Sequence, residues 1–280
     1  MDIISNLGQV RDLCFKVRLA RKKLALVPTM GFFHEGHLSL MKWAKKNADE
    51  VIVSLFVNPT QFGPGEDLEQ YPRDPERDMK LAEAVGIDYF FTPEAGDLYP
   101  ESFDTWIETP GLSKKLCGGC RPDHFRGVAT IVCKLLHLTL PHIAVFGRKD
   151  RQQLIIIQKM VSDLNIPVAI EGRPTFREHD GLAMSSRNSY LTPDQRKRAS
   201  YIYKGLLMTR NEVLSGKTGC TELEDQLVKY YLENLPGCDI DYVRIVDSAT
   251  LESPSGAGPD TFLAVAVRLG RARLIDNIDL

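Results

Sequence analysis

The sequence contains no segment with the composition of a membrane span or an export signal. No run of about eighteen apolar residues, the length needed to cross a bilayer, occurs among the 280 residues. Residues 1–6 lack the basic start and the long apolar stretch of a signal peptide. We therefore expect a cytoplasmic protein that makes no membrane contact.

The chain also lacks an excess of charge of either sign. It has 35 Lys and Arg residues against 37 Asp and Glu residues, a formal net charge of −2. Because nucleic-acid surfaces depend on clustered positive charge, this balance argues against a nucleic-acid partner. A Gly-x-Gly-x-x-Gly turn after a strand is missing too, which argues against the binding of a dinucleotide.

The six cysteines do not form the framework of a small disulfide-rich domain, because they are scattered along the chain. Cys117 and Cys120 are the one close pair. A zinc knuckle would need a second cysteine pair, and a redox motif would need a thioredoxin-like strand before it. We expect reduced thiols in a loop.

Strand signals alternate with helical ones through the first part of the chain. Strands are predicted at 24–27, 50–57, 89–92, 143–146 and 168–171, and 75–85 is typical of an amphipathic helix. Alternation of this kind predicts a doubly wound parallel sheet, a Rossmann-like α/β fold with ligands at the carboxyl ends of the strands. We assign residues 1–176 to this domain.

The pattern changes after Asn188. Thr192-Pro193-Asp194 is typical of a helix start, and we expect helices to about residue 214 and over 221–234. Apolar runs at 242–246, 261–267 and 272–275, separated by turns, predict an antiparallel sheet. Residues 177–280 are therefore predicted to form a smaller C-terminal α+β domain, hinged near Arg177 and closing over a bound nucleotide.

A histidine-containing turn follows the first predicted strand, at residues 30–37. Pro28 is expected to break that strand, and a helix begins near His34, so free helical N–H groups and two imidazoles converge where an anion binds well. The missing Cβ of Gly36 allows a phosphate to approach the backbone. The alternatives are that His34 and His37 only cap the helix, or that they bind a metal. The chain offers no further ligand for a metal, and we assign none.

A second polar segment, residues 177–188, is too polar to be predicted as core. Ser185, Ser186 and Arg187 supply hydroxyl and guanidinium donors suited to phosphate oxygens. Taken alone, the segment would also suit an ordinary surface turn.

Together, the two segments resemble the signatures of the adenylate-forming nucleotidyltransferases, a His-x-Gly-His helix start and a Lys-Met-Ser-Lys-Ser-like loop. Four blocks narrow the resemblance to the pantothenate synthetase family, which joins pantoate to β-alanine using ATP: residues 26–37, 54–63, 146–154 and 177–188. Their order and separation match the family over nearly the whole chain. The sequence departs from it in one block, where Arg148 and Arg151 replace an acid and an aromatic residue.

The resemblance implies roles for individual residues. The implied catalytic residues are His34, His37, Lys149 and Arg187, with His37 nearest the reacting phosphate. The implied ATP-binding residues are Met30, Gly31, His34, Gly36, His37, Gly147, Lys149, Asp150, Phe176, Met184, Ser185, Ser186 and Arg187. Gln61 and Gln153 would bind pantoate, and Gln61 and Tyr71 would bind β-alanine, with Arg121 and Arg126 as weaker candidates.

The implied reaction is an AMP-forming condensation through a pantoyl adenylate. Mg²⁺ is expected to arrive with ATP, no protein nucleophile is required, and a homodimer is expected. Two alternatives stay open at this point. One is a nucleotidyltransferase of another small acid, and the other is a nucleotide-binding homologue made inactive by Arg148 and Arg151.

Overall fold

The computed structural model describes all 280 residues, which divide into two compact units. The N-terminal unit comprises Met1–Ser113, Arg121–Arg148 and Gln153–Pro174, and the C-terminal unit comprises Lys114–Cys120, Lys149–Gln152 and Thr175–Leu280. The main boundary between the two units therefore falls after Pro174, near the predicted domain boundary after residue 176. Two short segments before this boundary also belong to the C-terminal unit. Closure of that unit over a nucleotide stays a prediction.

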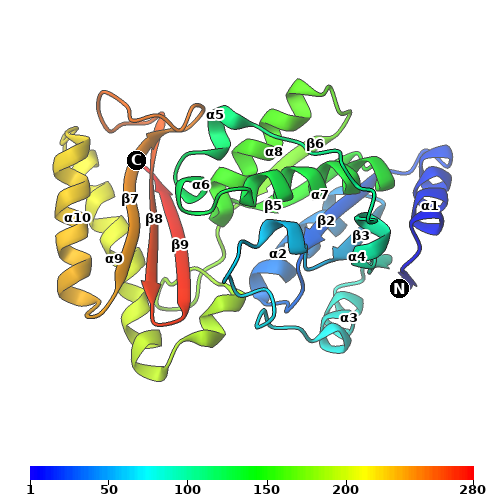
Figure 1. Cartoon of the computed structure of the whole chain (residues 1–280), viewed down its shortest axis with the longest axis horizontal. Helices are drawn as coiled ribbons and strands as arrows, with labels where there is room; N and C mark the ends of the chain where they lie inside the picture. The colour runs from blue at the N-terminus through cyan, green and yellow to red at the C-terminus, as the bar shows by residue number, and fades with distance from the viewer. The chain divides into compact units, whose positions relative to one another are not determined.

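The N-terminal unit is built on a six-stranded parallel sheet (Figure 1). Its strands are β1 (Asp2–Ile4), β2 (Leu24–Thr29), β3 (Glu50–Leu55), β4 (Tyr89–Phe91), β5 (Ile143–Gly147) and β6 (Ala169–Arg173). The order across the sheet is β1-β4-β3-β2-β5-β6. The five predicted strands and the doubly wound α/β class are confirmed. The edge strand β1, only three residues long, was not predicted.

Pro28 does not end its strand, contrary to the prediction. It pairs in register with Ser54, and Thr29 pairs with Leu55, so β2 runs beside β3 to its last residue. The pairing of β2 with β5 involves only Ala25 and Leu26. A missing N–H at position 28 therefore removes no ladder hydrogen bond on that side, which is how a strand tolerates proline.

Helices cover both faces of this sheet (Figure 1). They are α1 (Leu7–Leu19), α2 (Glu35–Asn47), α3 (Pro75–Ala84), α4 (Ala95–Leu98), α5 (Pro110–Ser113), α7 (His124–Thr139) and α8 (Arg151–Asp163), with 3-10 turns η1 (Pro59–Gln61) and η2 (Arg148–Asp150). Helices α2 and α3 bury Met41 and Ala82 against alternate strand residues such as Val27 and Val53. The intervening strand residues face the other side, where α1 and α7 pack on each other and on β2.

The connections reverse direction between β2 and β5. From β2 the chain moves outward through β3 to β4, and it then returns to the other side of β2 to form β5 and β6. In open α/β sheets, ligands bind at this switch point, outside the carboxyl ends of the strands. The His34 turn follows β2, and Gly147 ends β5, so both lie at this position.

The C-terminal unit has an antiparallel three-stranded sheet with two helices on one face (Figure 1). Strands β7 (Asp239–Asp247), β8 (Thr261–Leu269) and β9 (Ala272–Asp279) follow helices α9 (Pro193–Leu214) and α10 (Cys220–Asn234). Tyr231 is fully buried between them, and its hydroxyl donates to the carbonyl of Ile202 at 2.8 Å. The predicted α+β character and antiparallel sheet are confirmed.

All six cysteines are free. Cys117 and Cys120 lie in a single helical turn, α6 (Cys117–Cys120), and not in the predicted loop. The buried Cys117 sulfur lies 3.0 Å from the Tyr242 hydroxyl, so this turn packs on the C-terminal sheet. Among the helices of the protein, none combines the length and the apolar content that crossing a membrane would require.

Gly127 of α7 approaches the backbone around Gln61 so closely that no side chain fits between them. A Cβ atom there would lie 2.4 Å from the carbonyl oxygen of Thr60. We predict that Gly127→Ala lowers the free energy of unfolding by about 1–3 kcal/mol, because overpacking forces the backbone to shift. Chemical denaturation measures this.

Gly96→Ala in α4 is the matched control, because a Cβ atom at Gly96 meets nothing within 4 Å. It should leave stability unchanged or raise it by up to about 1 kcal/mol. Equal effects of the two substitutions would contradict the close approach.

Candidate active site

The turn after β2 reverses the chain through two residues with left-handed backbone. Gly31 has φ of 84° and Phe32 has φ of 50°. His34 then returns to extended backbone as the N-cap of α2, with φ of −133° and ψ of 174°. The sequence prediction of a helix beginning at this point is confirmed.

Both histidines cap the helix through the same ring nitrogen. His34 Nδ1 accepts the N–H of Gly36 at 3.2 Å, and His37 Nδ1 accepts the N–H of His34 at 3.4 Å. A nitrogen that accepts a hydrogen bond carries no proton, so each neutral ring has its proton on Nε2. The caps therefore place the proton of each neutral ring on Nε2.

The two imidazole rings pack against each other, and Phe33 packs against the ring of His37. The imidazole centroids lie 4.1 Å apart, and the ring of the buried Phe33 lies 5.5 Å from that of His37. One N–H of the helix start, that of Gly36, is already used by the cap.

Gln61 lies near this turn, in η1 after β3. Its side chain is buried, with Oε1 accepting from Asn58 Nδ2 at 3.3 Å and Nε2 lying 2.8 Å from the sulfur of Met30. Asn58 is also buried, and it donates to the carbonyl of Gly127 at 3.1 Å. The structure therefore brings Met30 and Gln61 together, as expected if both line one site.

The backbone of Gln61 is gripped by two side chains near the start of α7. Arg121 Nη2 and His124 Nδ1 lie 3.2 and 2.8 Å from its carbonyl oxygen. Arg121 also donates from Nη1 to His124 Nε2, at 3.2 Å, so this ring is neutral with its proton on Nδ1. Glu66 neutralises Arg121 through two further hydrogen bonds. Arg121 is thus already occupied by a carboxylate.

The other expected residues of the N-terminal unit differ in burial. Gly147 ends β5, and Gln153 is half-buried in α8. Tyr71 is buried, with its ring edge on Phe62. Arg126 pairs with Glu108 and Asp123 and stacks on Trp106, which makes it a poor candidate for a substrate carboxylate.

The two arginines that depart from the family pattern have structural partners. Arg148 is exposed, and its Nε donates to the carbonyl of Gly172 in the edge strand β6 at 3.2 Å. Arg151 pairs with Asp279 at 2.8 Å, and its guanidinium lies over the ring of Phe262. The charge of Arg151 is therefore used within the C-terminal unit.

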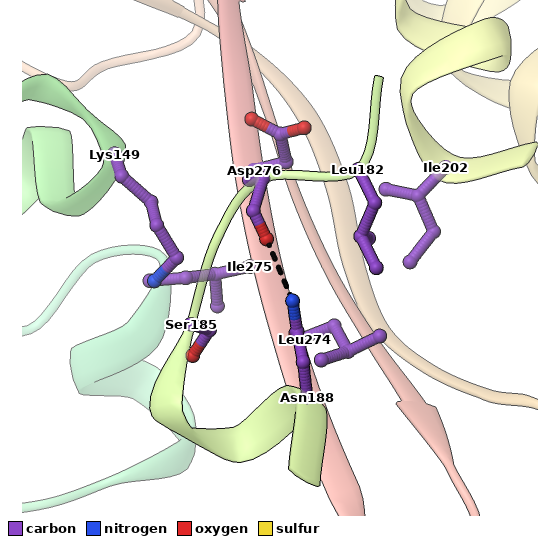
Figure 2. A pocket seen from close by; sticks show the side chains of 9 residues that line it. Lys149, Leu182, Ser185, Asn188, Ile202, Leu274, Ile275 and Asp276 are labelled. Carbon is purple, nitrogen blue, oxygen red and sulfur yellow. Dashed lines mark hydrogen bonds between the residues drawn. The ribbon is translucent and has the colours of Figure 1, made fainter. Parts of the chain in front are cut away.

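A small pocket in the C-terminal unit is lined by two of the expected ATP-binding residues, Lys149 and Ser185 (Figure 2). Lys149 extends toward the loop that carries Ser185, and Asn188 and Asp276 complete the polar lining. Its empty volume of about 230 Å³ includes open solvent, and its enclosed part holds no more than about one water molecule.

The charges of the 177–188 segment are mostly used to hold its shape. Arg177 donates to both oxygens of the buried Asp276, at 2.6 and 3.0 Å, and stacks on Tyr203. Arg196 pairs with Glu178 and Asp180, and its hydrogen bonds lower the pKa of Asp180. Burial nevertheless raises the pKa of Asp276.

Part of this segment is core, contrary to the prediction that it is too polar. Leu182, Ala183 and Ser186 are buried. Ser185 caps the 3-10 turn η3 (Ser186–Tyr190), with its hydroxyl accepting from the N–H of Arg187 at 3.3 Å. Phe176 is exposed.

Sequence reasoning missed the residues that support the site from a distance. They are Glu66, Asp78 and His124. Asn58, by contrast, was expected beside Gln61 because it is a polar residue directly after a strand. The three missed residues act through contacts with residues far away in the chain, for which the sequence has no local signature.

The fold and the imidazole turn define the class of protein: a nucleotide-binding α/β protein with its site at the switch point of a parallel sheet. The family model described as pantoate-β-alanine ligase matches residues 2–279. The chain belongs to this family of ATP-using ligases, as the sequence resemblance predicted.

Individual relatives and solved structures belong to the same family. The pantothenate synthetase of Maridesulfovibrio salexigens is 51% identical over 278 residues, covering 99% of each chain. The structure of pantothenate synthetase from Thermus thermophilus has a TM-score of 0.93 and 42% identity, covering 100% of this chain and 99% of that one. The ligase from Francisella tularensis, solved with β-γ ATP and β-alanine, has a TM-score of 0.81 and 33% identity, covering 100% and 97%.

The Arg177–Asp276 pair generates a stability prediction. Arg177→Leu should lower the free energy of unfolding by roughly 3–5 kcal/mol, because it leaves a buried carboxylate without its counter-charge. The double variant Arg177→Leu/Asp276→Leu should lose less, since no buried charge remains. Denaturant unfolding of both variants measures the difference.

Arg198→Leu is the control, because Arg198 pairs with Asp194 on an exposed helix surface. It should change stability by less than about 1 kcal/mol. A double variant no more stable than Arg177→Leu would show that the buried charge is not the cause.

Proposed function

We propose that this protein condenses pantoate with β-alanine at the expense of ATP, forming a pantoyl adenylate and then pantothenate and AMP. The observation that carries the residue assignments is the capped imidazole pair, which fixes two Nε2–H donors at the switch point of the sheet. Family membership supports the identity of the substrates.

The first half-reaction places an anion on a polyanion. The carboxylate of pantoate attacks the α-phosphorus of ATP, negative charge grows on the phosphoryl oxygens, and pyrophosphate leaves. His34 and His37 donate to these oxygens through Nε2–H, with His37 as the proton donor nearest the reacting phosphate. A preorganised donor of this kind is typically worth about 3–4 kcal/mol of transition-state stabilisation.

Residues of the C-terminal unit also bind the phosphates of ATP. Lys149 and Arg187 supply positive charge, and Ser185 and Ser186 supply hydroxyl donors to phosphate. The narrow pocket that Lys149 and Ser185 line supports this assignment. Lys149 keeps its carbonyl bonded to Asn277 and its Nζ lies 3.8 Å from Asp150, so its position is set by the protein before substrate binds.

The remaining ATP contacts are assigned by family pattern. Asp150 binds the ribose hydroxyls, and the backbone of Gly147 and Phe176 frames the nucleoside. The residues that complete the nucleotide site are Met30, Gly31, Gly36 and Met184. Gly36 lies between the two histidines, where a missing side chain lets a phosphate approach the backbone.

Mg²⁺ enters with the nucleotide. The donors at the turn are N–H groups, and no group of three or more His, Cys, Asp or Glu side chains is arranged to hold a metal ion. The residues present fit an ion carried on the β- and γ-phosphates, where it would stabilise the departing pyrophosphate.

Gln61 and Gln153 bind pantoate. Asn58 holds the side-chain amide of Gln61, and Arg121 and His124 hold its backbone carbonyl, so a hydroxyl or carboxylate meets a fixed group. Gln61 and Tyr71 bind β-alanine. Its amine then attacks the acyl carbon of the adenylate, and AMP leaves with no protein nucleophile.

The reaction takes place in the cytoplasm, and the active form is a homodimer.

The inactive homologue has no observation in its favour. Arg151 serves the structure of the C-terminal unit, and Arg148 bonds to a strand edge. A nucleotidyltransferase of another acid is not favoured either, because family membership extends over residues 2–279.

Removing the donors should abolish the first half-reaction. We predict that His37→Ala and Lys149→Ala each slow pantoate-dependent pyrophosphate release by about two to three orders of magnitude. His137→Ala and Lys159→Ala are controls, because both lie exposed on helices. A single-turnover assay of pyrophosphate separates this step from amide formation. Wild-type rates in either test variant would refute the assignment.

A second pair of variants separates capping from catalysis at His34. Asn is as good an N-cap as any residue, and its Oδ1 can replace Nδ1 as the acceptor, but it has no group equivalent to Nε2–H. His34→Asn should keep the stability of the wild type and lose adenylate formation. His34→Ala should lose both, with a stability cost of about 0.5–2 kcal/mol. Full activity in His34→Asn would mean that His34 acts only as a cap.

A further inference from the structure

We propose that Asp78 is a positioning residue that holds the histidine turn in its active geometry. This inference rests on the proposed function, because the turn it positions carries His34 and His37. Asp78 lies in α3, more than forty residues after the turn, and nothing in the family's pattern of substrate-binding blocks includes it.

The Asp78 carboxylate binds two successive backbone N–H groups of the turn. Oδ2 accepts from Phe32 at 2.6 Å, and Oδ1 accepts from Phe33 at 2.7 Å. The side chain is buried. Both oxygens are thus committed to the backbone immediately before His34, at the end of the turn that the helix cap does not reach.

This contact holds a backbone conformation that the local sequence disfavours. Phe32 has φ of 50°, in the left-handed region that a bulky residue rarely adopts. Gly31 has φ of 84°, and a Cβ atom there would lie 3.0 Å from Asp78 Oδ2. The turn therefore needs an external acceptor close to its backbone, and only the small Gly31 leaves room for it.

The position of the turn is transmitted directly to the imidazoles. Phe33, whose N–H Asp78 accepts, places its buried ring against His37. The next N–H, that of His34, is accepted by His37 Nδ1. A shift of the Phe32–Phe33 backbone would therefore move both rings and their Nε2–H donors.

The burial of this carboxylate is costly, which argues that it is kept for position and not for stability. Burial raises the pKa of Asp78, whereas the N–H groups of Phe33 and Phe32 lower it. The charged groups facing it are Arg77, 4.0 Å away and half-exposed, and Asp74. Neither replaces the two backbone donors, so the turn is the main partner of this charge.

Asp78→Asn tests the inference. The Asn side chain has the same shape as Asp but only one acceptor oxygen. Its NH₂ group would face one of the two backbone N–H groups and cannot accept a hydrogen bond from it. We expect kcat for pantoate-dependent pyrophosphate release to fall about 10²-fold, the effect of a misplacement of about 1 Å. The KM values for ATP and pantoate should change little. Imidazole ¹⁵N chemical shifts, which do not depend on activity, should show altered environments for His34 and His37.

Asp74→Asn is the matched control, because Asp74 starts the same helix by accepting the N–H of Arg77. Asn caps helices equally well, so this variant should keep the wild-type rate and the wild-type imidazole shifts. Wild-type kcat in Asp78→Asn, or a lower kcat with unchanged imidazole shifts, would overturn the inference.

If Asp78→Asn does not fold, Phe32→Gly/Asp78→Asn replaces it, with Phe32→Gly as its own control. Gly adopts positive φ without strain, so the double variant removes the cost of the turn while still lacking the carboxylate. The same result is expected relative to Phe32→Gly: slower turnover and altered imidazole shifts. Equality with Phe32→Gly in both readouts would overturn the inference. A wild-type enzyme that releases no pantoate-dependent pyrophosphate would refute the proposed function instead, and the imidazole shifts would still test the role of Asp78.

Discussion

The hydrogen bonds that two imidazole nitrogens accept at the start of α2 are the constraint on which the site depends. They use Nδ1 of His34 and of His37 and thereby fix the proton of each ring on Nε2. The sheet places this helix start at its switch point, and Phe33 supports the ring of His37. In the proposed function, structure and chemistry use opposite sides of the same rings, because the caps that stabilise the helix also set which ring nitrogen donates.

The fold was largely predictable because its signals are local. Strands buried on both faces appear as apolar runs, and the turns that separate them are recognised from their residue types. The failures have physical reasons. Strand β1 buries only one residue, Ile4, and therefore lacks the apolar run by which the equally short β4 was predicted. Strand β2 passes through Pro28 because that residue lies beyond its pairing with β5. Whether a proline breaks a strand is decided by the neighbouring strand, which local sequence does not specify.

The candidate site was predictable only where its residues lie in contiguous motifs. His34 and His37 are separated by one helical turn, and Ser185 to Arg187 are consecutive, so each group was visible by itself. Gln61 also followed a strand. The groups that hold Gln61 in place, Arg121 and His124, lie about sixty residues away and reach its carbonyl only through the packing of α7 on η1. Such support has no sequence period.

The 177–188 segment shows why polarity alone is a poor guide to binding. Arg177 pairs with Asp276, and Arg196 pairs with both Glu178 and Asp180, so the positive charge of both arginines is balanced within the C-terminal unit. These pairs fix the path of the chain between them, where Leu182 and Ala183 are buried and Ser185 lines the same pocket as Lys149. Arg151 follows the same logic, since its charge is balanced by Asp279. A charged residue in such a segment is therefore evidence of a ligand only after its protein partners have been counted. By that criterion Arg177 supports the loop, and Lys149, whose carboxylate neighbour Asp150 lies 3.8 Å away, remains the better candidate to meet a phosphate.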